Sequence, residues 1–423
     1  MLHFVHVLII LCLLFASGMY LAWPVAAQMD SSAFQQQLQS LMNTLHGKRV
    51  ALLTNPTGVD DHFDFIADRL ISDASITLVC FFAPEHGLRG DQQAGGGVQD
   101  YTDPISGLPV YSLYGSRLAP TADQLQGVDV LVFDIQDVGV RFYTYVWTMT
   151  YAMESAAANG VKFVVFDRPN PIGCDRVEGA PIPFDGGLVG RLWPGQPFGV
   201  STRHGMTVGE IARLVNGAWM NPKAELEVIP IPGYTRSMTF QQTGYPWVIP
   251  SPNMPTIDTA TVYPGTCVFE GVNLSEGRGT TRPFEFIGAP FINAFDYANA
   301  LNALDLPGVR FRAAYFTPMF DDHAGKQCGG VQVHVTNVNQ FDPIRTGLYM
   351  LKTVVTMYPS NVTVGSYVST LMGFSNLHTR IQTEQVDSLI AEWQTNLDAF
   401  KTLREEYIIY PTSVGGVSLW ATQ

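Results

Sequence analysis

The strongest constraint on the fold of this chain is a regular alternation of apolar and amphipathic segments between residues 48 and 168. The apolar segments are short and nearly continuous in hydrophobic residues, which is typical of strands that are buried on both faces. Helical patterns lie between them at 60–71 and 143–159. The alternation predicts a mostly parallel sheet covered by helices on both faces, with strands at 49–54, 76–82, 110–114, 128–135 and 161–166.

The second half of the chain has a different pattern. Its proline-rich stretch between residues 230 and 255 is typical of a crossing between domains. The length of 423 residues also exceeds what one ordinary hydrophobic core supports. We therefore expect an α/β domain over residues 33–235 and an α+β domain over residues 236–423. The second domain is predicted to contain strands near 267–272, 309–316 and 330–335, and helices near 344–357 and 386–403.

Charge and the N-terminal sequence limit the setting in which the protein acts. The net charge of −13 argues against electrostatic binding to nucleic acid or to anionic lipid. An apolar segment at 7–17, followed by Val25-Ala26-Ala27, predicts a cleaved signal peptide over residues 1–27, although no Lys or Arg precedes it. An uncleaved anchor is the alternative. We expect a secreted or periplasmic protein with no stable membrane span after signal removal.

Several common cofactor and metal motifs are absent from the sequence. It has no G-x-G-x-x-G after the first strand, no P-loop, no G-x-S-x-G and no H-E-x-x-H. The four cysteines beyond the signal segment form no C-x-x-C pair, so a zinc site is not expected, and a disulfide stays an open possibility. We expect neither a metal nor a cofactor.

The most distinctive polar motif, Pro84-Glu85-His86-Gly87-Leu88-Arg89, directly follows the second apolar segment. Active sites in open α/β sheets collect at such strand ends. A carboxyl group held against apolar side chains keeps its proton more readily, which is what a general acid needs. We interpret Glu85 as a candidate general acid, with His86 and Arg89 beside it. A surface turn that contains a salt bridge is the plain alternative.

Other polar loops follow the first, fourth and fifth predicted strands. Asn55 ends the first strand, and the run from Asp134 to Tyr145 combines carboxylates, an amide, a guanidinium and phenols. The fifth strand ends in Asp167-Arg168-Pro169-Asn170-Pro171, where prolines stiffen the loop. Capping, core packing or stiff connections would explain these loops without function. The candidate binding or catalytic residues here are Asn55, Asp134, Gln136, Arg141, Tyr143, Arg168 and Asn170.

The second half contributes Ser251-Pro252-Asn253-Met254-Pro255 and a polar, glycine-rich run over residues 270–285. Its candidate residues are Asn253, Asn273, Glu276, Arg278 and Arg282. If both halves place their loops in one cleft, the site combines carboxylates, amides, arginines and aromatic rings. Such a set suits a carbohydrate, with arginine holding an acidic substituent. A solvated loop with local ion pairs is the alternative for 270–285.

Taken together, these motifs resemble the exo-β-N-acetylmuramidase (NamZ-type) family, formerly a domain family of unknown function. The resemblance runs in order from about residue 47 to the C-terminus through the motifs at 53–58, 82–90, 133–145, 167–171, 250–255 and 270–283. It implies a Rossmann-like N-terminal domain, an α+β C-terminal domain and an active site in the cleft between them. It also implies release of N-acetylmuramic acid from the non-reducing end of peptidoglycan fragments, with Glu85 as the catalytic carboxyl.

The partner of Glu85 stays open at this stage. Asp134, Asp137 or Glu276 would act as the base of an inverting reaction or as the nucleophile of a retaining one. The substrate's own 2-acetamido group is a third option, oriented by Asp134, Tyr143 or Asn273. Arg141, Arg278 or Arg282 is expected to hold the lactyl carboxylate of muramic acid. The alternatives to this function are a non-catalytic cell-wall sugar-binding protein and a hydrolase of another β-hexosaminide.

Overall fold

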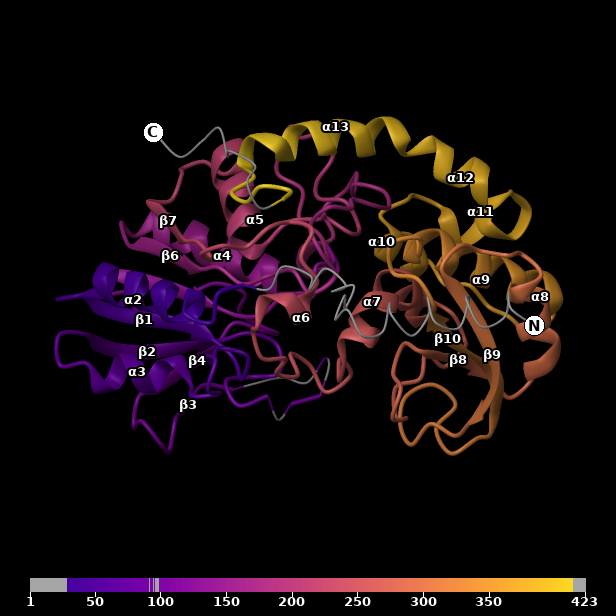
Figure 1. The fold of residues 1–423 in the computed structure, drawn as a ribbon, viewed down its shortest axis with the longest axis horizontal. Coiled ribbons are helices and arrows are strands. Elements are labelled where there is room, and N and C mark those ends of the chain that lie inside the picture. The colour runs from indigo at the N-terminus through magenta and orange to yellow at the C-terminus, as the bar shows by residue number, and fades with distance from the viewer. Residues whose placement is uncertain (1–28, 91, 94, 96–98, 414–423) are drawn as a thin grey trace, which may run out of the picture.

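The structure is a computed structural model that describes residues 29–90, 92–93, 95 and 99–413 (Figure 1). The expected signal peptide at 1–27 therefore lies outside the described residues. Two lobes lie side by side, one around a large sheet and one around a small sheet. Of the helices that the described residues form, none has the length and apolar character needed to cross a bilayer.

The first domain is built on a seven-stranded sheet with the order β3-β4-β2-β1-β5-β6-β7. All neighbours are parallel except β3 and β4. From β4 to β7 this is the strand order of a doubly wound Rossmann sheet, with β1 at the centre. The α/β prediction is thereby confirmed. The strands are β1 (Arg49–Thr54), β2 (Thr77–Ala83), β3 (Tyr101–Thr102), β4 (Pro109–Ser112), β5 (Val130–Asp134), β6 (Lys162–Phe166) and β7 (Leu226–Ile229).

Consecutive residues of the central strand face two separate hydrophobic layers. Val50 and Leu52 belong to one cluster of buried side chains, and Ala51 and Leu53 to the other. This is the period-2 alternation of a strand covered on both faces. The helices of this domain are α2 (Ala33–Leu45), α3 (Ile66–Ser72), α4 (Tyr145–Ala158), α5 (Val208–Leu214) and α6 (Phe240–Thr243). The helix expected from residue 60 begins only at Ile66, because residues 60–65 form turns in which Asp60 accepts backbone hydrogen bonds.

The second domain has a three-stranded antiparallel sheet with the order β8-β10-β9. Its elements are α7 (Ile257–Thr266), β8 (Phe286–Ala289), α8 (Ala294–Asn302), β9 (Val309–Phe316), β10 (Cys328–Val335), α9 (Pro343–Met357), α10 (Tyr367–Met372), α11 (Leu377–Thr383), α12 (Val386–Glu392) and α13 (Gln394–Arg404). The predicted α+β class is confirmed.

Two predicted elements of this domain are wrong in detail. The segment expected as a strand at 267–272 is a 3-10 helix over Cys267–Gly271. The apolar run at 386–403 forms two helices, α12 and α13, rather than one. The break falls at Trp393, whose backbone leaves the helical region (φ −92°, ψ 0°) while its ring packs edge-on against Phe374. The apolar residues keep their helical spacing on both sides of Trp393, so the hydrophobic pattern alone did not reveal the break.

The domains meet through a continuous apolar core. Rings from the N-terminal domain, Phe142 and Tyr143, lie 5.3 and 6.0 Å from the Tyr263 ring of α7. Tyr263 in turn packs 4.6 Å from Phe284. These ring contacts hold the two domains as one packed body.

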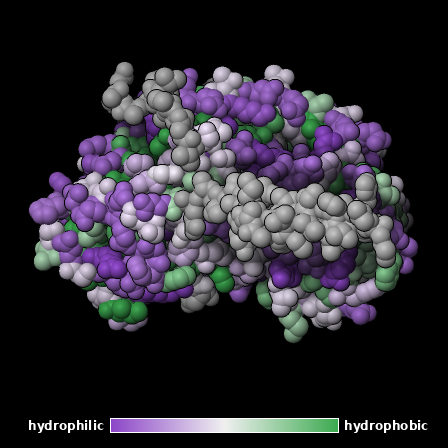
Figure 2. Space-filling view, in the orientation of Figure 1, coloured by the Kyte–Doolittle hydropathy of each residue, from purple (hydrophilic) through white to green (hydrophobic). Residues whose placement is uncertain are grey.

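On the face seen in Figure 2, hydrophilic side chains prevail on both lobes and hydrophobic ones are scattered.

The chain crosses between the domains twice. After the first crossing it builds the second domain, and α13 then carries it back over the first (Figure 1), where the turn at Glu405–Tyr407 packs against α5. There Arg404 donates to the carbonyl of Gly205, and the Tyr410 hydroxyl donates to Asp167. The last described residues are thus part of the N-terminal domain, although α7 to α12 are not.

Candidate active site

The polar loops gather at the carboxyl edge of the parallel sheet, where the strand order changes direction. From β1, the chain builds outward through β2 and then crosses to β5 on the other side. Ligands of doubly wound sheets bind in the crevice at such a switch point. Asn55 follows β1, Glu85 follows β2 and Asp137 follows β5, so three adjacent strands present their polar residues to one crevice.

Glu85 is almost completely buried and is held by groups from three segments. Its Oε2 accepts a hydrogen bond from the Thr144 hydroxyl at 2.9 Å, and its Oε1 accepts one from the Gly95 N–H at 3.0 Å. Burial raises the pKa of the Tyr114 phenol, and the charge of Glu85 and a hydrogen bond to it raise this pKa further. Tyr114 and Thr144 were not predicted as site residues. Thr144 lies inside the predicted 134–145 loop, but Tyr114 carried no sequence signal.

His86 and Arg89 shape the loop around Glu85. His86 has a positive φ of 72°, and its Nδ1 lies 2.7 Å from the Gln92 carbonyl, which ties the following loop back. Arg89 forms a bidentate ion pair with Asp103, with contacts at 2.9 and 3.0 Å. The structure thus places His86 next to the site as a positioning residue. Arg89 already has a carboxylate partner inside the protein.

A second polar cluster lies beside Glu85, and its polar atoms lack partners. Eight buried polar atoms of the described side chains make no hydrogen bond of normal geometry, and four of them belong to this cluster: Asn55 Nδ2, Asp137 Oδ1, Tyr143 Oη and His204 Nε2. Burial raises the pKa of Tyr143 well above its usual range, and the charges of Asp137 and Glu85 raise it further. Tyr143 therefore lies within electrostatic reach of both carboxylates. His204 was not singled out from the sequence, where it stood as one scattered histidine.

Asp134 and Arg168 form a buried structural pair rather than a free catalytic group. Arg168 Nε and Nη2 donate to the two Asp134 oxygens at 2.6 and 3.1 Å, and both side chains are at most 2% exposed. Arg168 also donates to the Val59 carbonyl. Burial raises the pKa of Asp134, and the charge of Arg168 opposes this shift. This geometry argues against the expected catalytic role of Asp134 and the expected binding role of Arg168.

Two amides of this edge serve the loops themselves. Gln136 donates to the carbonyls of Asp137 and Pro169, which joins the loops after β5 and β6. Asn170 donates to the Met206 carbonyl and accepts from the Ile172 N–H, so both ends of its amide are occupied. Their positions at the sheet edge were predicted. Their hydrogen bonds show that they position the loops.

Arg141 is enclosed instead of facing an open cleft. Its side chain is fully buried, and its guanidinium donates to the carbonyls of Val189 and Leu371. Burial lowers the pKa of Arg141 to about 9. The carbonyl of Leu371 belongs to the second domain, so Arg141 joins the two domains. This geometry argues against its expected contact with a lactyl carboxylate.

The second domain contributes a charged network to the same region. Arg278 donates to Glu276 and Glu270, both at 2.8 Å. Burial raises the pKa of Glu276 to about 7, although the charge of Arg278 lowers it. The pKa of the Tyr367 phenol is shifted by the charges of Glu270, Arg278 and Tyr114. The network and the Tyr114 side of the Glu85 pocket therefore face the same ring.

Two predicted residues of the second half keep free polar groups near the domain junction. Asn253 lines a cavity between the domains together with Gln93 and Thr280. Arg282 follows this cavity wall, has a side chain 43% exposed and reaches Glu285 only at 3.5 Å. Asn273, by contrast, donates to the Asn361 carbonyl and accepts from the Thr363 N–H, which places its amide in a loop contact of the second domain.

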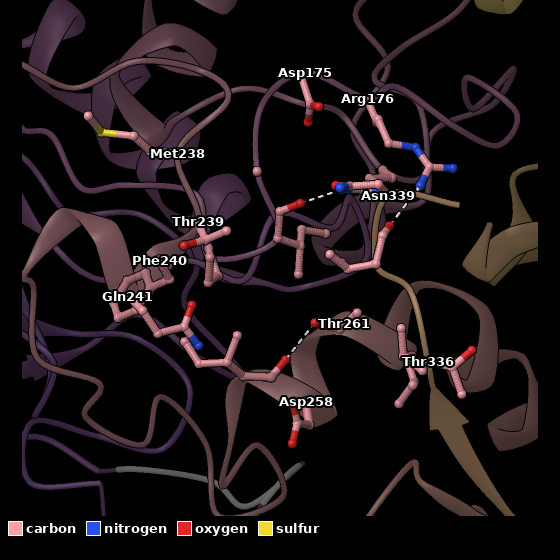
Figure 3. A pocket seen from close by; sticks show the side chains of 18 of the residues that line it. Asp175, Arg176, Met238, Thr239, Phe240, Gln241, Asp258, Thr261, Thr336 and Asn339 are labelled. Carbon is pink, nitrogen blue, oxygen red and sulfur yellow. Dashed lines mark hydrogen bonds between the residues drawn. The ribbon is translucent and has the colours of Figure 1, made fainter. Parts of the chain in front are cut away.

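A second interdomain cavity, of about 380 Å³, lies elsewhere (Figure 3). Figure 3 shows Asp175 and Arg176 of the first domain on one side of it, and Asp258 and Thr261 of α7 on the other. Arg176 is already paired with Glu178 and donates to the Phe341 carbonyl. None of the predicted site residues lines this cavity, so it is separate from the Glu85 pocket.

One group of described residues could in principle ligate a metal: Asp60, Asp61 and His62. Asp60 is committed to two backbone N–H groups and to Arg69 at 2.9 Å. His62 and Asp61 pair with each other at 3.2 Å. The donor set is therefore used within the fold.

Comparison with known proteins identifies the family. Residues 50–258 match the model of the N-terminal domain of exo-β-N-acetylmuramidase NamZ, and residues 261–410 match the model of its C-terminal domain. The chain belongs to the NamZ family. The boundary between the two models falls at 258–261, and residues up to Tyr245 pack in the core of the first domain. The sequence pattern instead predicts this boundary after residue 235.

Relatives of the NamZ family match along most of the chain. The peptidoglycan β-N-acetylmuramidase NamZ of Bacillus subtilis (strain 168) is 46% identical over 371 residues, covering 86% of this chain and 88% of the relative. Crystal structures of two DUF1343 family proteins from Bacteroides fragilis superpose with TM-scores of 0.81 and 0.69, at 34% and 28% identity. Each covers 89% of this chain and 98% of the other. The predicted family and two-domain fold are confirmed.

Proposed function

We propose that this NamZ family protein is an exo-β-N-acetylmuramidase that releases N-acetylmuramic acid from the non-reducing ends of peptidoglycan fragments. Membership of the family and 46% identity to a peptidoglycan β-N-acetylmuramidase support this reaction. The observation that carries it within the fold is the position of Glu85. A carboxyl group stands at the carboxyl edge of the sheet, beside the switch point, with hydrogen-bond donors on both of its oxygens.

We assign Glu85 as the general acid that protonates the glycosidic oxygen. Thr144 and the Gly95 N–H hold the carboxyl group in one orientation, which is what proton transfer to a positioned oxygen requires. His86 ties the loop that supplies Gly95, so it supports this orientation indirectly. When the bond breaks, the resulting carboxylate keeps both donors and is ready to take a proton from water.

The second domain is proposed to bind the remainder of the substrate. Of the expected arginines, Arg282 has the weakest internal ion pair, and it adjoins the cavity that Asn253 lines. An exposed guanidinium at this place suits the lactyl carboxylate of muramic acid. Asn253 offers an amide for sugar hydroxyl groups. The substrate is an amino sugar fragment of peptidoglycan, and no nucleic acid partner is proposed.

The cellular setting is also a proposal. The N-terminal sequence motivates an exported, secreted or periplasmic enzyme that contributes to recycling of the cell wall. Its substrates would then be fragments released outside the cytoplasm. Detection of the mature N-terminus at Gln28 in exported protein would support this setting, and a retained N-terminus in the cytoplasm would contradict it.

The test is hydrolysis of para-nitrophenyl β-N-acetylmuramide beside the glucosamine analogue. The wild type is expected to prefer the muramide. The change Glu85→Gln should lower kcat by roughly 10²- to 10⁴-fold for a disaccharide substrate, and less for the activated aryl leaving group, which needs little protonation. Glu225→Gln is the matched control, because Glu225 is exposed and directly precedes β7.

Three results would contradict the proposal. Full turnover of the disaccharide by Glu85→Gln would remove the acid assignment. Fragment binding by the wild type without any hydrolysis would instead support a cell-wall sugar-binding protein. Preference for the glucosamine analogue would support a hydrolase of another β-hexosaminide.

A further inference from the structure

Four unpartnered polar atoms beside Glu85 call for a physical explanation. Asn55, Asp137, Tyr143 and His204 are all at least 92% buried, yet each has a polar atom that makes no hydrogen bond of normal geometry, although Tyr145 lies near Asn55 and Ser251 near Tyr143. Leaving one buried polar group unpaired costs about 1–3 kcal/mol. Such groups are rare in folded proteins and concentrate at sites of catalysis or binding.

The arrangement of these atoms is set by the surrounding backbone. Asp137 Oδ2 accepts the Gly139 N–H at 2.6 Å, which leaves Oδ1 free. The Met206 N–H donates to His204 Nδ1 at 3.2 Å, so Nδ1 is an acceptor and the ring hydrogen lies on Nε2. His204 Nε2 faces the Asp137 carboxylate at 3.7 Å, too far for a hydrogen bond.

The other two atoms approach the same place from β1 and the start of α4. Asn55 Oδ1 accepts from the Thr57 N–H and hydroxyl, which leaves Nδ2 to face the Tyr145 phenol without a hydrogen bond of normal geometry. The Thr57 hydroxyl contacts the Gln136 N–H, so the loop after β1 is joined to the loop that carries Asp137. Contacts with the side chains of Asn55 and Tyr143 lower the pKa of the Tyr145 phenol, which burial raises. This phenol donates to the Pro250 carbonyl.

The cluster therefore offers one acceptor, Asp137 Oδ1, and donors from an amide, a phenol and an imidazole. A secondary amide has the complementary pattern, with one N–H donor and one carbonyl acceptor. The proposed substrate carries such a group at C2, next to the reacting carbon. Resting on the proposed function, we propose that Asp137 and Tyr143 bind the 2-acetamido group of the sugar, and that this group is the nucleophile of the reaction.

In the first step, the acetamido carbonyl oxygen forms a bond to C1 and the bond from C1 to the leaving oxygen breaks. Glu85 gives its proton to that oxygen. Asp137 holds the amide N–H hydrogen, which stabilises the positive charge of the cyclic intermediate. In the second step, water attacks C1, Glu85 takes a proton from it, and the ring opens to restore the amide. The net reaction is hydrolysis with retention of configuration.

The other candidate carboxylates fit this role poorly. Asp134 is bound bidentately by Arg168 and has no free oxygen edge. Glu276 is paired with Arg278 in the second domain. Asp137 is the candidate that combines burial, a free oxygen and a place at the switch point between β1 and β5.

The first test varies the acyl group of an aryl β-muramide from N-acetyl to N-trifluoroacetyl. Fluorine withdraws electrons from the carbonyl oxygen, so the wild-type kcat should fall on the order of 100-fold or more if this oxygen attacks C1. NMR should show the β-anomer first. A kcat that is independent of fluorination, or an α-anomer formed first, would overturn the proposal while leaving the muramidase function intact.

The second test is Asp137→Asn, which keeps an oxygen for the Gly139 N–H. It should lower kcat by roughly 10²-fold or more for aryl and disaccharide substrates alike, and it should flatten the response to fluorination. Asp185→Asn is the matched control, because exposed Asp185 accepts from the Gly187 N–H in the same type of turn. Equal kcat for Asp137→Asn and wild type would refute the assignment. Absence of turnover by the wild type would refute the proposed function itself.

Discussion

The buried pair of Asp134 and Arg168 makes a sharp prediction about stability. Both side chains are at most 2% exposed, and two hydrogen bonds join them. The changes are Asp134→Leu, Arg168→Met and the two combined. Because these residues stand between the loops after β5 and β6, the measurement asks whether they support the site edge as structure.

The expected magnitudes follow from the partners. Removing Asp134 alone leaves an uncompensated buried guanidinium, which costs about 3–5 kcal/mol of unfolding free energy. Removing Arg168 alone costs a similar amount, plus about 1 kcal/mol for its bond to the Val59 carbonyl at 3.0 Å. The double change replaces the pair by apolar groups, so it should lie within about 2 kcal/mol of wild type. With single losses of at least about 3 and 4 kcal/mol and a double loss of at most about 2, the coupling energy is then at least about 5 kcal/mol.

Denaturation in urea, followed by tryptophan fluorescence, measures all four proteins. The midpoints of the single variants should fall well below that of the wild type, with the double variant in between. Single variants that lose less than about 1 kcal/mol would refute the reasoning. So would a double variant whose loss equals the sum of the two single losses, because that result means no coupling.

Two further predictions concern pH and packing. The pKa of Glu276 is raised from 4.5 to about 7, so the folded protein binds this proton more tightly than the unfolded chain does. The stabilising effect of this protonated carboxyl is present below pH 4.5 and is lost as the pH rises through 7. In Glu276→Gln, the unfolding free energy measured in urea should therefore change less between pH 5 and 8 than it does in the wild type, by up to roughly 3 kcal/mol. An unchanged pH profile would contradict this. A methyl group on Gly265 would meet the Pro343 carbonyl at 1.8 Å, where α7 and α9 touch. Gly265→Ala should cost about 3 kcal/mol, and an unchanged thermal midpoint would show that the helices separate freely.

The sheet and the site edge could be predicted because their signals are local. Continuous apolar strands ended by polar loops fix the carboxyl edge, and β1 was predicted at its observed bounds, Arg49–Thr54. The two strands of the second sheet hairpin, β9 and β10, were found for the same reason. The positions of Glu85 and Asn55 at the sheet edge could be predicted because each comes at the end of an apolar strand, where sites of such sheets lie.

The pairings inside the site could not be predicted. Nothing in the spacing of Arg141 shows that its guanidinium ends against a carbonyl of Leu371, 230 residues away. Nor does the sequence separate Asp134, which is neutralised by Arg168, from Asp137, which stands three residues later with a free oxygen. Tyr114 and His204 lacked a local pattern because only long-range folding brings them to the cleft.

The return of the chain through α13 has a mechanical consequence. A lobe attached at a single point can swing in any direction, whereas one attached at two points turns only about the line that joins them. Arg404 and Tyr410 anchor the returning segment on the first domain, and the segment near Pro250 forms the other attachment. With the shared apolar core filling the junction, that rotation is opposed as well. Tyr145, which donates to the Pro250 carbonyl, places one of the two attachments next to the switch-point crevice.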